Sequence, residues 1–122
     1  MSKSDVLGLI DYLSHIKEAI ERIHEYVDDL DEVGFLSDRK TQDAVIRNFE
    51  VIGEASRNIQ KYHSEFALHN EWLPLNSAYE MRNALAHGYF KVDLEIVWKT
   101  IHSNLNQLHG QISELLEEIG RQ

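Results

Sequence analysis

Cysteine is absent from the 122 residues, so disulfide bonds and zinc sites built on thiolates are excluded. No apolar run approaches the roughly 20 residues that a membrane-spanning helix needs. The first residues run directly into an amphipathic pattern and lack the apolar stretch of a signal peptide. We therefore expect a cytoplasmic protein that has no membrane segment.

Positive charge is also scarce, and the formal net charge is −9. Residues 1–38 hold ten acidic and three basic residues, whereas residues 39–99 hold eight of each. The acidic ends are expected to be solvated helix surfaces that keep the protein soluble. The middle of the chain is the part least repulsive to a polyanion such as RNA, and it leaves room for a local basic cleft.

The length suits one domain over residues 1–122, with a small core that a partner subunit would extend. From Asp5 to Leu30 the apolar residues recur at alternating steps of three and four, which predicts a helix. Asp93 is a candidate cap for a last helix of the same pattern, with Val92 and Val97 as a hydrophobic staple. We expect these two long helices to pack side by side.

Between them, Ser37 is the expected N-cap of a helix that runs to about Tyr62. Gly53 lies inside that helix and suggests close backbone packing, because a glycine there is otherwise destabilising. A loop or short helix should fill residues 63–73. Pro74, the single proline, is placed to open another helix that ends near His87. The chain is predicted to be all-α, an antiparallel bundle of four to five helices.

Most sequence motifs of enzymes are missing: there is no glycine-rich phosphate loop, no zinc-protease motif and no nucleophile elbow. Histidine occurs seven times, yet the spacing shows no ligand pair one helical turn apart. We therefore predict no metal site and no cofactor. Six histidines are interpreted as surface or boundary residues: His15, His24, His63, His69, His102 and His109.

The segment from Arg82 to Tyr89 is the strongest candidate for a functional site. Arginine binds phosphate oxygens with a planar fork, and histidine exchanges protons near neutral pH. Arg82 and His87 could thus cleave RNA without a metal, with Asn83 orienting either group. Spacing alone favours an ordinary structural interpretation, in which the arginine forms an ion pair, the histidine lies at a helix terminus and the tyrosine packs at a helix corner.

The same segment resembles the signature of HEPN ribonucleases in its HepT form: arginine, a polar residue, a short spacer, histidine, one residue, tyrosine. Residues 38–45 resemble the start of that family's second helix, and residues 52–55 resemble its Ile-Gly-Glu-Ala segment. Residues 92–98 resemble the region after the signature. The resemblance covers approximately residues 5–110.

This resemblance implies a helical homodimer in which two signatures face one cleft, and a toxin that acts on RNA. It also implies a partner, a nucleotidyltransferase antitoxin of the MntA-like type, which adds AMP to the signature tyrosine. In this chain that tyrosine is Tyr89. The catalytic residues it implies are Arg82 and His87.

Three functions remain in competition. The first is a metal-independent endoribonuclease toxin, cutting tRNA or mRNA. The second is a non-catalytic helical partner of a nucleotidyltransferase, and the third is a purely structural bundle. The intact set of Arg82, His87 and Tyr89 favours the first, because a structural bundle gives no reason for that cluster.

Overall fold

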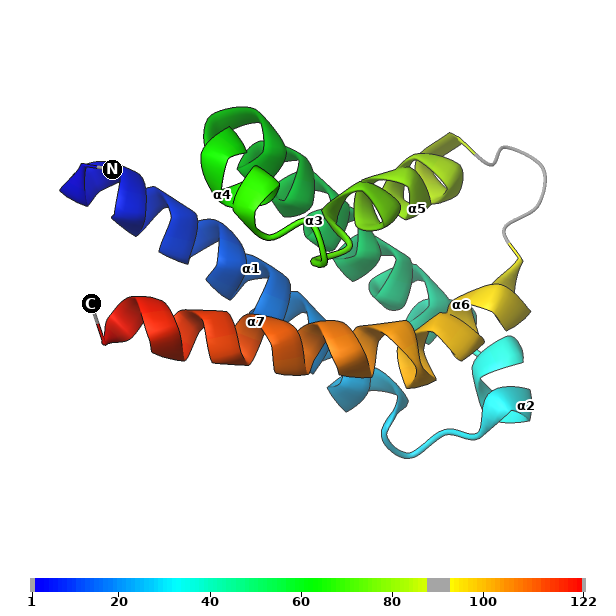
Figure 1. Cartoon of the computed structure of the whole chain (residues 1–122). Coiled ribbons are helices and arrows are strands. Elements are labelled where there is room, and N and C mark those ends of the chain that lie inside the picture. Colours follow the sequence, from blue (N-terminus) through cyan, green and yellow to red (C-terminus); the bar gives the residue numbers. More distant parts are fainter. Residues whose placement is uncertain (1, 88–92, 122) are drawn as a thin grey trace.

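The computed structural model describes residues 2–87 and 93–121, and every regular element within them is a helix (Figure 1). This confirms the predicted all-α bundle. The helices are α1 (Lys3–Val27), α2 (Glu32–Leu36), α3 (Arg39–Tyr62), α4 (Ser64–His69), α5 (Leu75–His87), α6 (Leu94–His102) and α7 (Asn104–Gly120). None of the described helices is long and apolar enough to cross a membrane.

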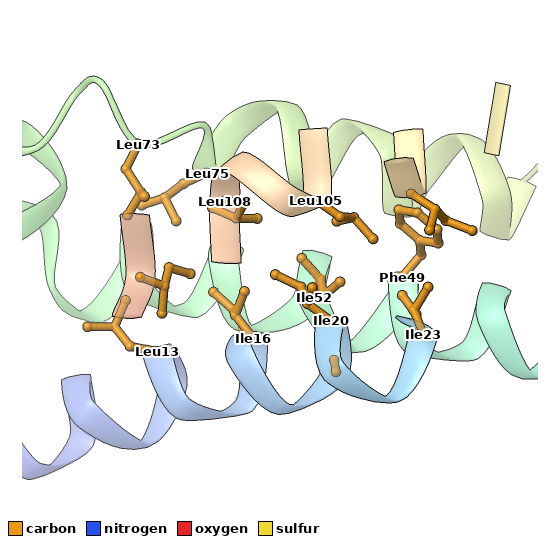
Figure 2. Close-up of a cluster of buried hydrophobic side chains, with 14 of the residues drawn as sticks. Leu13, Ile16, Ile20, Ile23, Phe49, Ile52, Leu73, Leu75, Leu105 and Leu108 are labelled. Carbon is orange, nitrogen blue, oxygen red and sulfur yellow. The ribbon is translucent and has the colours of Figure 1, made fainter. Parts of the chain in front are cut away.

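The core forms where the predicted apolar seams meet, and Figure 2 shows side chains of α1 pointing toward those of α3 and α7. Leu13, Ile16 and Ile20 on α1 have no exposed surface. α1 also contacts α7, as the two terminal seams predicted. Burying such side chains stabilises the fold by about 1.5–3 kcal/mol each. The chain ends therefore hold the scaffold, and the middle of the chain is left to form the site.

Helix α3 lies between α1 and α5 and makes its most extensive contacts with these two helices. It begins one residue later than expected, because its N-cap is Asp38 and not Ser37. The Asp38 carboxylate accepts hydrogen bonds from the backbone N–H and the hydroxyl of Thr41. Ser37 instead ends α2, a short helix that the sequence did not predict, and its hydroxyl donates to the carbonyl of Val33. A carboxylate is the stronger acceptor at a helix N-terminus, which explains the one-residue shift.

The predicted last helix is wrong in one respect, because it is broken into α6 and α7 at Ser103. The Ser103 hydroxyl lies 2.7 Å from the carbonyl oxygen of Lys99 and 2.9 Å from Oδ1 of Asn104. Such side-chain bonds compete with the helix's own backbone bonds. The apolar seam continues across the break through Ile101 and Leu105, so periodicity alone could not reveal it.

The remaining predicted helix ends can be checked in the described residues. Residues 64–69 form the short helix α4, and α5 begins directly after Pro74. Asp93 caps α6 by accepting hydrogen bonds from the backbone N–H groups of Glu95 and Ile96. Gly88, the glycine that follows His87 and is suited to end α5, and the staple residue Val92 both lie outside the described residues.

Candidate active site

Helix α5 is amphipathic only in part, and its apolar residues determine which of its side chains pack on the core. Leu75 is its one fully buried residue, while Ala78, Met81 and Leu85 are half-buried against the core. Their spacing of three and four residues fixes the face that packs on the bundle. Arg82 follows Met81 and is half-buried at the edge of that face, facing α3.

Gly53 is the reason that α3 and α5 can approach so closely. A methyl group at Gly53 would collide with Cβ of Arg82 and would lie 2.8 Å from its Cγ and 3.0 Å from the carbonyl oxygen of Ala78. Neither the stem of a side chain nor a backbone carbonyl moves aside easily. The close packing predicted at this glycine is confirmed, and its partner is the candidate catalytic arginine.

The Arg82 guanidinium is held at both ends of its fork. Its Nη2 lies 2.8 Å from Oε1 of Glu54, and its Nη1 donates to Oδ1 of Asn83 at 3.0 Å. The Arg82 side chain is 28% exposed and that of Glu54 is 53% exposed. A planar fork with two fixed contacts has few orientations left. Asn83, which the sequence predicted as an orienting residue, thus contacts Arg82.

The third guanidinium nitrogen, Nε, is buried and has no hydrogen-bond partner among residues 2–87 and 93–121. An unpaired buried donor costs about 1–3 kcal/mol. Arginine carries five N–H donors, so the fork keeps donors beyond the two contacts above. The guanidinium is therefore held in one orientation and keeps N–H donors that the contacts with Glu54 and Asn83 do not occupy.

His87 is the last residue of α5 and its side chain is exposed. It lies five positions after Arg82 along one continuous helix, which corresponds to a rise of about 7.5 Å and a difference in direction of about 140°. The two side chains thus share the C-terminal end of α5 but point to different sides of it. Tyr89 lies outside the described residues.

Glu54 is the residue that sequence reasoning missed. In the sequence it is only part of residues 52–55, the segment that resembles the family, and nothing in the sequence connects it to Arg82, 28 positions later. The useful signal was Gly53, whose implied close packing had no assigned partner. Once α5 is placed against that glycine, the next residue of α3 meets the arginine.

The six histidines interpreted as surface or boundary residues are indeed exposed or half-buried. Three of them make polar contacts. His109 bonds to Glu21 at 2.9 Å, His24 to the carbonyl of Ile101, and His102 to the carbonyl of Trp98. Over the described parts of the chain, no group of three histidine or acidic side chains is placed to hold a metal ion.

Comparison with known proteins shows which family the chain resembles. The model of the family described as "Ribonuclease HepT-like" matches residues 16–115. A "Probable ribonuclease HepT" of Thermococcus cleftensis is 44% identical over 105 residues, 86% of this chain and 93% of that protein. Two proteins named "Putative RNase" are 33% and 34% identical, from Methanocaldococcus jannaschii (98% of this chain, 93% of that protein) and Caldanaerobacter subterraneus (88% and 93%).

No solved structure gives a significant match. The family match covers α3 and α5 completely, and therefore spans the Gly53–Glu54–Arg82 contact and His87. The protein belongs to the HepT-like family of HEPN ribonucleases.

Proposed function

We propose that this ribonuclease cleaves RNA internally through Arg82 and His87. The observation that carries the proposal is the fixed guanidinium of Arg82, which Glu54 and Asn83 orient on α5, five positions before His87 at the end of the same helix. Preorganised donors stabilise charge that develops in a transition state better than mobile ones do.

In the proposed reaction the ribose 2′-oxygen attacks the adjacent phosphorus and the bond from phosphorus to the 5′-oxygen breaks. His87 takes the proton of the 2′-hydroxyl or supplies one to the leaving 5′-oxygen. Arg82 stabilises the charge on the non-bridging oxygens. The products are a 2′,3′-cyclic phosphate and a 5′-hydroxyl, and a 2′-deoxyribose at the cut position should resist cleavage.

One histidine cannot be base and acid in the same step, so a second copy of the site is useful. We propose a symmetric homodimer in which two α5 termini face one cleft. Each chain then contributes one Arg82 and one His87. Light scattering at micromolar concentration should show a dimer, and a monomer that cleaves RNA at full rate would contradict this arrangement.

We also propose that the protein is the toxin of a toxin–antitoxin pair and that a nucleotidyltransferase neutralises it by transferring AMP from ATP to the hydroxyl of Tyr89, with release of pyrophosphate. Tyr89 follows His87 by two residues. Each AMP would bring a negative phosphate and considerable bulk close to the proposed catalytic residues, which would repel RNA. After incubation with the partner and ATP, mass spectrometry should locate the adduct on Tyr89, and Tyr89→Phe should escape neutralisation.

The deciding experiment is RNA cleavage by purified protein in EDTA. We expect cleavage by the natural chain and almost none by Arg82→Ala or His87→Ala, with circular dichroism confirming that both variants fold. Equal cleavage by His87→Ala, or complete dependence on a divalent ion, would refute the mechanism. No cleavage together with AMP transfer to Tyr89 would instead indicate a non-catalytic partner of the nucleotidyltransferase.

A further inference from the structure

A groove separate from the end of α5 lies on the other side of α3, between α3 and α1. It has a volume of about 170 Å³ and is open to solvent. Tyr12 and His15 of α1 line one wall, and Arg47, Glu54 and Asn58 of α3 line the other. A groove with two rings, an arginine and an amide has the chemistry to hold a nucleotide.

Glu54 belongs to both places, because its carboxylate lines the groove and also pairs with Nη2 of Arg82 at 2.8 Å. The groove therefore begins one side chain away from the proposed catalytic arginine. The ion pair also offsets part of the negative charge of the half-exposed Glu54 carboxylate, which reduces its repulsion of a phosphate.

The direction of α3 relative to α5 places Arg47 and His87 at the same end of this helix pair. Gly53 contacts Arg82, whereas Arg57, one turn later on α3, lies 5.5 Å from the ring of Tyr79, one turn earlier on α5. The two helices are therefore antiparallel. Arg47 consequently lies toward the end of α3 that accompanies the His87 end of α5, at a similar distance along the axis of about 7–9 Å.

The aromatic wall is already a cluster of rings. The Tyr12 ring lies 6.5 Å from that of His15 and 5.9 Å from that of His63, both in edge-to-face geometry. His15 is exposed, and Tyr12 is half-buried against the core. Rings held in this way offer faces on which an unpaired base can stack at little entropic cost.

Charge favours the same surface. Helix α3 carries five basic and three acidic residues, a net charge of +2, while α1 is −2 and α7 is −3. Within the described chain α3 is the only helix with a net positive charge. The Arg47 side chain is 71% exposed and pairs with Glu50 only at 3.6 Å, so it remains available to a phosphate.

We infer that the α1–α3 groove binds a nucleotide of single-stranded RNA next to the bond that is cut. The base stacks on Tyr12 and His15, Asn58 hydrogen-bonds to it, and Arg47 binds the adjoining phosphate. This inference rests on the proposed ribonuclease function, and it adds a binding subsite that is distinct from the catalytic residues.

The test uses a short fluorescent 2′-O-methyl RNA, which cannot be cleaved, and measures its dissociation constant by anisotropy. Arg47→Gln should weaken binding about five- to tenfold and reduce the salt dependence by about 0.7 in the log–log slope. His15→Ala should weaken it about fivefold or more. For a cleavable RNA both variants should raise KM and leave kcat within about twofold.

A matched control is Arg121→Gln. Arg121 is 74% exposed and pairs with Glu117 of its own chain segment at 3.4 Å, as Arg47 pairs with Glu50, but it follows the acidic helix α7. It should change binding by less than about twofold. Equal effects of Arg47→Gln and Arg121→Gln would show that only total charge matters and would overturn the inference.

A second readout locates the base directly. With 5-iodouridine in the same RNA, irradiation should cross-link it to Tyr12 or His15, and mass spectrometry identifies the residue. Cross-links elsewhere, with cleavage intact, would overturn the subsite and leave the nuclease proposal standing. Cross-links to Tyr12 or His15 without any cleavage would support the subsite and overturn the nuclease proposal. RNA that is neither bound nor cut would refute both.

Discussion

Glu54 of α3 and Arg82 of α5 form an ion pair of 2.8 Å directly beside Gly53, the glycine at which an added Cβ would collide with Arg82. The close packing of α3 against α5 at Gly53 thus has two consequences: it brings the helices into contact, and it orients the guanidinium of Arg82. The glycine sets the spacing of the helices, and the glutamate uses that spacing to reach the arginine.

This relationship predicts that Glu54→Gln will lower kcat for RNA cleavage by roughly 10- to 100-fold, because Arg82 loses the charged one of its two orienting partners. KM should change by less than about threefold. The pair is partly exposed, so the free energy of unfolding should fall by no more than about 1 kcal/mol. Glu117→Gln on α7 is the charge-matched control, and an equal loss of kcat there would contradict a positioning role.

Gly53→Ala should lower the free energy of unfolding by up to about 2 kcal/mol, measured by urea titration. Overpacking against Arg82 and Ala78 costs about 1–3 kcal/mol, and the higher helix propensity of alanine offsets about 1 kcal/mol.

The control is Gly110→Ala in α7, where an added Cβ meets nothing within 4 Å. That variant should stabilise the protein by about 0.5–1 kcal/mol. A stabilising Gly53→Ala would mean that α5 does not rest on this glycine.

The sequence predicted the helices well wherever a one-sided apolar pattern was long. The seam of α1 and those of α3 and α7 are visible as repeats, since burial follows the helical period. It failed where a local side-chain contact decides the backbone. Ser103 breaks the last helix, and Asp38 takes the cap position from Ser37, through hydrogen bonds that no periodicity encodes.

The site was predictable only along one helix. Arg82, Asn83 and His87 are close in sequence, so a short segment contains them all. Glu54 and the groove residues Tyr12 and Arg47 come from other helices, and their proximity depends on how α1, α3 and α5 pack. That packing is a property of the whole core and is not carried by any local segment.

A separate pH dependence should come from Glu21, whose pKa is lowered below its ordinary value of 4.5 chiefly by the hydrogen bond from His109. A lowered pKa in the folded state means that this contribution to stability is present above about pH 4.5 and is lost as the pH falls further. The Glu21 side chain is 53% exposed, so the contribution should stay below about 1 kcal/mol.

Urea titrations of the natural chain and Glu21→Gln between about pH 5 and pH 3 should therefore converge at the acidic end. A difference in the free energy of unfolding that stays constant across this range would show that the carboxylate charge is not involved.

Arg82→Lys tests whether the arginine acts through its shape as well as its charge. A lysine keeps the positive charge, but it has a single ammonium in place of a fork that contacts Glu54 and Asn83 together. Removing one preorganised donor from a developing oxyanion typically costs about 100- to 1000-fold in kcat, so we expect a loss of at least about 100-fold. RNA affinity should fall much less, since the charge remains. Cleavage within tenfold of the natural rate would mean that Arg82 serves only as a point charge, and would leave the contacts with Glu54 and Asn83 without a catalytic role.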